Sequence, residues 1–137
     1  MDLSERPWLI ELPDSFDQHF ERIRITNEKK EPVGKGLRWI SSHKIKSREL
    51  QRLGRFVQAN WHDQNALNPL DRFTLGVVSN ASLDVLAPGL VGSALAYGIA
   101  LKVEMGPFDQ AAQLAASSSH PFFKTTFDAI LYAPFWE

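Results

Sequence analysis

The clearest pattern of hydrophobic and polar positions lies between Phe73 and Gly106. Phe73–Val78 is almost uniformly apolar, which predicts a central strand covered on both faces of a sheet. A short polar turn, an apolar helical segment that ends at Gly98 and a second apolar strand over Ile99–Met105 follow. This order predicts a βαβ unit, whose two strands are parallel.

Asn80 or Ser82 is expected to cap the helix of this unit, because both residue types accept hydrogen bonds from free backbone amides. Pro88 is expected either to bend the helix or to mark its first turn. Apolar residues at helical spacing predict its buried face: Leu83, Leu86, Leu90, Val91, Ala94 and Leu95.

A second helix is predicted over Pro107–Ala116 and a third parallel strand over Phe127–Ala133. The predicted fold class is therefore α/β: a three-layer, partial doubly wound parallel sheet of the flavodoxin or SGNH-hydrolase type, preceded by an α-helical extension. Three strands are few for such a sheet, so residues 73–137 are expected to be either an incomplete core or one completed by a second subunit as a homo-oligomer.

The preceding residues 1–72 have helical periodicity and are predicted to pack on that core as an extension. One helix is expected to start near Asp14 or Ser15 and to bury Phe16, Phe20 and Ile23. A loop is expected over Asn27–Gly36, because this segment is charged and contains proline and glycine.

A short amphipathic turn is then expected at Leu37, Ile40 and His43, followed by a helix capped by Ser47. Its apolar stripe consists of Leu50, Leu53, Phe56, Val57 and Trp61. The segment His62–Arg72, rich in Asn, Asp and Pro, is expected to be a linker.

Composition narrows the class of protein. The 137 residues include no cysteine, which excludes disulfides, thiolate metal sites and a cysteine nucleophile, and favours a cytoplasmic location. No signal peptide is recognisable, and prolines, glycines and Lys102 interrupt Val85–Val103, so no membrane-spanning segment is expected. No pattern indicates a cofactor, and His62, Asp63 and His120 lack the paired spacing of metal ligands.

The residues from Leu37 to Ala133 resemble the amino-terminal, SGNH-hydrolase-like domain of FkbH-like proteins, a family associated with haloacid-dehalogenase domains. The resemblance is carried by the turn and helix start Ser79–Pro88, the Gly98-Ile99 turn, Gly106–Gln110 and Phe127–Leu131. FkbH-like proteins form glyceryl thioesters on acyl carrier proteins in polyketide-type biosynthesis. The resemblance implies that the partner is an acyl carrier protein, or a haloacid-dehalogenase-like domain or subunit.

The family's phosphoryl chemistry belongs to an Asp-x-Asp motif, and this sequence contains none. Similarity to SGNH hydrolases instead places a candidate nucleophile at Ser82. His120 is the candidate base, on the condition that the turn after the second predicted helix folds over the sheet edge. No histidine here has the aspartate that those hydrolases place three residues before their base. The expectation is therefore a protein that is not catalytic on its own, with a small Ser82 esterase as the alternative.

Two further sites are candidates for binding. The backbone at Asn80, Ala81 and Ser82 is expected at a helix start, where amides can hold a phosphate or carboxylate, although Asp84 opposes an anion there. Residues 35–55 form a basic helical face with seven Lys and Arg against one Glu, and Arg48, Arg52 and Arg55 are its candidate partner-binding residues.

This basic face is expected either to dock an acidic carrier protein or simply to be solvated. Nucleic-acid binding is the second alternative, and it is disfavoured because no nucleic-acid motif is present. Trp39 and Trp61 flank the basic residues and are expected to pack in the core rather than to stack on bases.

Overall fold

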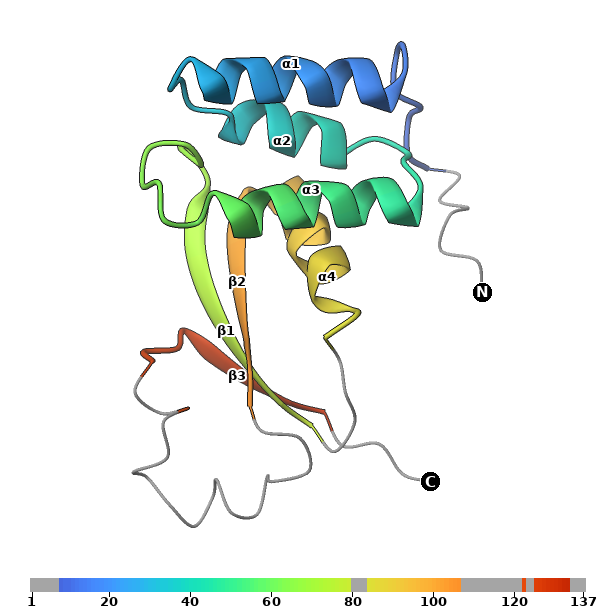
Figure 1. The fold of residues 1–137 in the computed structure, drawn as a ribbon. Helices are drawn as coiled ribbons and strands as arrows, with labels where there is room; N and C mark the ends of the chain where they lie inside the picture. The colour runs from blue at the N-terminus through green and yellow to red at the C-terminus, as the bar shows by residue number, and fades with distance from the viewer. Residues whose placement is uncertain (1–7, 80–83, 107–121, 123–124, 134–137) are drawn as a thin grey trace.

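The computed structural model describes residues 8–79, 84–106, 122 and 125–133. It has an α/β fold, with helices gathered around one end of a parallel sheet (Figure 1). In chain order the elements are α1 (Phe16–Glu28), α2 (Gly34–Ser41), α3 (Ser47–Ala59), β1 (Asp71–Ser79), α4 (Ala87–Ala94), the short 3₁₀ helix η1 (Leu95–Tyr97), β2 (Ile99–Met105) and β3 (Ala129–Ala133).

The three strands are parallel and lie in the order β2-β1-β3, so the strand predicted to be central is central. The register pairs Leu75 with Val103 of β2 and with Ala129 of β3. The predicted β2 bounds are confirmed, and the third strand begins at Ala129 rather than at Phe127. The helix predicted over residues 107–116 lies outside the described residues.

Both faces of β1 are covered, because successive side chains of a strand point to opposite sides. Phe73 and Leu75 pack against the cluster that the helices form. Val78 packs on the other face with Phe122 and Phe127, whose rings are 4.7 Å apart. The uniform apolar run in the sequence therefore reflects two different packing environments.

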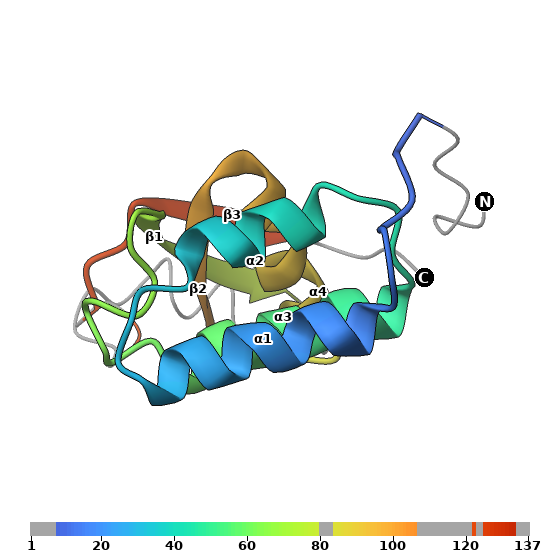
Figure 2. The ribbon, with the colours of Figure 1, turned by 90° about the horizontal axis from the view of Figure 1, so that it is seen from above.

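One apolar core joins the amino-terminal helices to the βαβ unit. α4 packs on β2 and α3 packs on α4, while α2 lies against η1 (Figure 2). The core includes Ile23 of α1, Leu37 and Ile40 of α2, Leu53 and Val57 of α3, Val91 of α4, and Ala100 of β2. The helices at the start of the chain and the sheet thus bury their apolar surfaces together.

Two glycines bring α3 and α4 into backbone contact. A Cβ atom built on Gly92 would lie 2.1 Å from the carbonyl oxygen of Leu50, and one built on Gly54 would meet Pro88 in the same way. Only glycine leaves room for such an approach. This crossing fixes how the helical layer sits on the sheet.

The amino-terminal helices correct several predicted boundaries. Ser15 caps α1, its hydroxyl accepting a hydrogen bond from the Gln18 amide at 3.2 Å. The loop predicted from residue 27 is shorter, since α1 continues to Glu28 and α2 begins at Gly34. Ser47 is not the cap of α3: Lys46 occupies that position, and its amide donates to the Glu49 carboxylate at 3.2 Å.

The helix of the βαβ unit starts later than predicted. It begins at Ala87 with Leu86 before it, so neither Asn80 nor Ser82 caps it, and Pro88 marks its first turn. Leu86 and Leu90 are 56% and 43% exposed, so their predicted burial is wrong, whereas Val91 and Leu95 are fully buried. Because the residues before Ala87 form a turn, the helical spacing that grouped Leu86 with the buried face does not apply there.

Gly98 ends the helical segment as predicted, with a left-handed φ of 77°. The predicted linker has neither helix nor strand before β1 begins at Asp71, and Ala66, Leu67 and Leu70 are buried within it. Arg72 holds it in place by donating to the carbonyl oxygens of Trp61 and Asp63 at 2.7 and 2.9 Å.

Candidate functional site

The carboxyl edge of the sheet is the first candidate site. β1 ends at the buried Ser79, whose hydroxyl donates to the Ala133 carbonyl oxygen at 2.6 Å and so ties β1 to β3. Asn80, Ala81, Ser82 and His120 lie outside the described residues. The esterase pair and the anion site therefore stay predictions, and the helix expected to supply the anion-binding amides starts at Ala87.

The basic face of α3, formed by Arg48, Arg52 and Arg55, is the second candidate site. All three side chains are exposed, and their spacing places them opposite the buried Leu53 and Val57.

Arg52 differs from its two neighbours in its contacts. Its guanidinium donates to the Asp17 carboxylate at 2.7 Å and lies 5.1 and 5.0 Å from the ring centroids of Phe16 and Phe20. Arg48 and Arg55 form no ion pair with any residue that the structure describes. Arg52 is thus engaged within the molecule, while Arg48 and Arg55 present their charges outward.

Two other cations of residues 35–55, Arg38 and Lys44, lie away from this face. The Arg38 guanidinium lies beside Gly98, where a Cβ on that glycine would be 3.0 Å from it. Lys44 lies after α2 and its side chain lines a cavity on the other side of the α3 start. The high local charge of the sequence is therefore distributed over separate surfaces.

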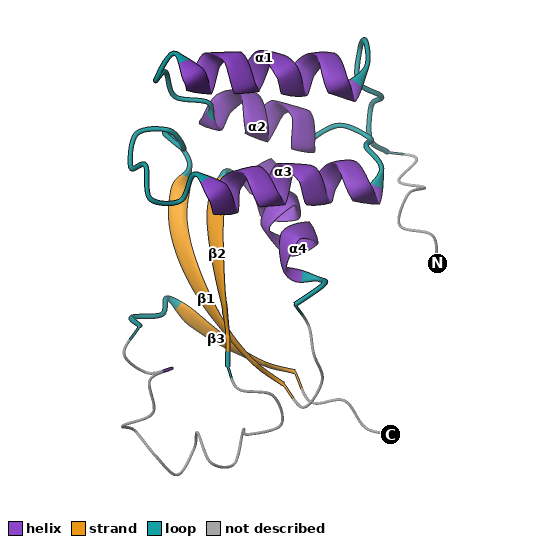
Figure 3. Cartoon of the chain, in the orientation of Figure 1, coloured by secondary structure: helices purple, strands orange, loops and turns teal. Residues whose placement is uncertain are grey.

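The two candidate sites lie at different ends of the sheet. α3 is near the amino ends of β1 and β2, whereas Ser79 ends β1 on the far side (Figures 1 and 3). Helices and the carboxyl parts of the strands are well separated in Figure 3. A ligand at the carboxyl edge and a protein on the α3 face would consequently contact different surfaces.

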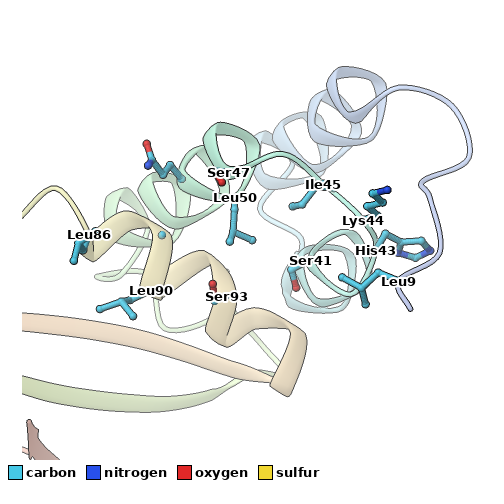
Figure 4. A pocket seen from close by; sticks show the side chains of 12 residues that line it. Leu9, Ser41, His43, Lys44, Ile45, Ser47, Leu50, Leu86, Leu90 and Ser93 are labelled. Atoms are coloured by element: carbon cyan, nitrogen blue, oxygen red, sulfur yellow. The ribbon is translucent and has the colours of Figure 1, made fainter. Parts of the chain in front are cut away.

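Sequence reasoning did not find the cavity of about 280 Å³ that lies between the α2–α3 connection and α4. Figure 4 shows Ser41, Leu50 and Ser93 around its middle, with Lys44 toward one end and Leu90 toward the other. The sequence carried no signal for it, because Leu86 and Leu90, which line it, were predicted to be buried. Only the placement of α4 against α3 shows that they line a hollow.

An aromatic cluster joins α1 and α2. Trp39 is 43% exposed and stands between His19 and His43, with ring centroids 5.0 and 4.4 Å away. The Nδ1 atom of His43 is 2.6 Å from the Trp39 carbonyl oxygen. The predicted core position of Trp39 is therefore wrong, whereas Trp61 does pack against the core.

The part of the chain that the structure describes contains no group of three or more His, Asp or Glu side chains placed to hold a metal ion. Within the same residues, no helix combines the length and the apolar character needed to cross a membrane.

Comparisons with protein-family models, with curated proteins and with solved structures find no match for this chain. The resemblance to FkbH-like proteins thus rests on the sequence motifs alone.

Proposed function

We propose that this chain is a protein-binding α/β domain of the FkbH-like type that docks an acyl carrier protein through the basic face of α3. The single observation that carries the proposal is the outward presentation of Arg48 and Arg55 on a rigid helix. Carrier proteins of this kind are acidic, and complementary charge accelerates encounter and orients the partner.

The contacts of Arg52 define its part in docking. Because its guanidinium is held by Asp17 and the two phenylalanine rings, it contributes less free charge than its neighbours. Reversal of Arg48 and Arg55 is therefore expected to weaken docking most. Since α3 is buried through Leu53 and Val57 on its opposite side, these reversals leave the core unchanged.

The test is a calorimetric titration of the chain with an acidic acyl carrier protein at two salt concentrations. The Arg48→Glu/Arg55→Glu chain is expected to bind at least tenfold more weakly, and the affinity of the unmodified chain is expected to fall with salt. Lys29→Glu/Lys35→Glu is the matched control, because it changes the net charge equally at two exposed lysines away from this face.

Absence of binding, or equal loss in both double variants, would overturn docking at this face. If single-stranded DNA with the same net charge as the carrier protein bound with equal affinity, docking would also be overturned, and the nucleic-acid alternative would be favoured.

A further inference from the structure

We infer that the cavity between the α2–α3 connection and α4 binds a small amphipathic anion, a medium-chain carboxylate with its head group near Lys44 and its chain along α4. This site is independent of carrier-protein docking and uses none of the arginines of the α3 face.

The cavity exists because of the close crossing of α3 and α4. Gly54 and Gly92 place the two backbones in contact, so the side chains of Leu50 and Leu90 stand beside the crossing and form its walls. Gly89 also lines the cavity, and a Cβ atom built on it would have no neighbour within 4 Å. The open space is thus a consequence of the packing of these helices.

Its lining changes character from one end to the other. Leu86 and Leu90 lie toward one end, and Leu9, His43 and Lys44 lie toward the other (Figure 4). Between them are the hydroxyl groups of Ser41 and Ser93. An apolar chain would cover the two exposed leucines, and a negatively charged head group would meet the Lys44 ammonium and the Ser93 hydroxyl, because the Ser41 hydroxyl already donates to the Arg38 carbonyl oxygen at 3.1 Å.

Lys44 is held in position by its backbone. The Lys44 amide donates to the Ile10 carbonyl oxygen at 2.8 Å, and the backbone of Glu11 forms a parallel β-bridge with Lys44. Glu11, Asp14 and Glu49 line a neighbouring hollow that the same lysine borders, yet among the described residues no carboxylate lies within 4.0 Å of its ammonium group. The lysine can therefore pair with a ligand in the cavity.

The volume limits the size of the ligand. At the roughly 30 Å³ that a water molecule occupies in the liquid, about 280 Å³ accommodates roughly nine non-hydrogen atoms. Octanoate is close to this size. Each methylene removed from the chain is expected to weaken binding by roughly fourfold.

The experiment titrates the whole chain with octanoate, butyrate and octylammonium, by calorimetry and by amide NMR shifts. Octanoate is expected to bind with one-to-one stoichiometry, to bind tighter than both other probes and to shift the amides of Ser41 and Ser93. The Gln58 amide, on the far part of α3, serves as the internal reference.

Two variants test the two ends of the site. Gly89→Leu places a side chain in the cavity from a helical position that has free space around it. This variant is expected to bind octanoate at least tenfold more weakly. Lys44→Gln is expected to weaken octanoate binding at least threefold and to reduce the preference of the chain for octanoate over octylammonium. Lys35→Gln on α2 is expected to leave both the affinity and the preference unchanged.

Lack of octanoate binding, or a folded Gly89→Leu chain that binds within twofold of the original, would overturn the site. Octylammonium binding as tightly as octanoate would overturn the assignment of an anion. Should Gly89→Leu fail to fold, the amide shifts of the unmodified chain decide, and shifts confined to residues outside the cavity would overturn the inference.

Discussion

A Cβ atom built on Gly54 of α3 would lie 1.8 Å from the carbonyl oxygen of Pro88 in α4, so the backbones of these two residues are in direct contact. Pro88 belongs to the first turn of α4, and its carbonyl cannot move away without shifting the helix on the sheet. The relationship between α3 and the βαβ unit therefore depends on the absence of a side chain at residue 54.

Gly54→Ala is expected to destabilise the protein by about 2 kcal/mol, because the clash outweighs the gain of up to about 1 kcal/mol in helix propensity. Gly89→Ala is the matched control in α4: with free space around its Cβ, it should stabilise by roughly 0.5–1 kcal/mol. Urea unfolding of the three chains measures both effects. Equal stabilisation by the two alanines would contradict the backbone contact.

Gly98→Ala is expected to cost about 1–2 kcal/mol, since an alanine at a φ of 77° is in the left-handed region that L residues with a side chain avoid. Gly98→Asn should cost less, because asparagine tolerates this conformation better. Thermal unfolding of both variants is the measurement. A Gly98→Ala chain as stable as the original would show that the turn can adopt another conformation.

Leu53→Ala is expected to cost roughly 2–5 kcal/mol, because Leu53 is fully buried in the shared core and its truncation leaves a cavity. Leu86→Ala, at a 56% exposed leucine, should change stability by less than about 0.5 kcal/mol. Denaturant midpoints compare the two. Similar losses would mean that Leu86 is buried in solution.

The Arg52–Asp17 pair is expected to have a coupling energy of about 0.2–1 kcal/mol in a double-mutant cycle, decreasing with salt, because both side chains are exposed. Arg52→Ala should cost more than Asp17→Asn, since it also removes the contacts with Phe16 and Phe20. Arg55→Ala is the control and should leave stability within about 0.5 kcal/mol. A larger loss for Arg55→Ala would contradict its outward position.

Asp128→Ala is expected to cost about 1 kcal/mol, because the Asp128 carboxylate accepts a hydrogen bond from the Thr74 amide at 2.7 Å just before β3 begins. Asp128→Asn keeps an acceptor oxygen and should lose less. Hydrogen exchange at the Thr74 amide reports the contact directly. Unchanged protection in Asp128→Ala would show that this residue does not fix how β3 joins β1.

Predictions that depended on local chemistry were the most accurate. The hydroxyl of Ser15 caps α1, Gly98 adopts a left-handed conformation, and Ile99–Met105 forms β2, as the sequence indicated. In each case the cause lies in neighbouring residues, which the sequence contains in full.

The wrong predictions concern burial, which depends on contacts between residues that are far apart in the sequence. Trp39 was predicted to pack in the core but is exposed between two histidines. The helical spacing of Leu86 and Leu90 predicted burial that the position of α4 does not provide. Burial depends on which elements meet, and periodicity alone does not specify that.

The sequence by itself determined the α/β class, the order of elements and the central place of β1, because apolar periodicity and turn residues act locally. Only the tertiary structure decided that Arg52 is tied to Asp17 while Arg48 and Arg55 point outward, and that a cavity lies between the α2–α3 connection and α4 beside the glycine contact. These features arise from the approach of side chains and backbones that are far apart along the chain.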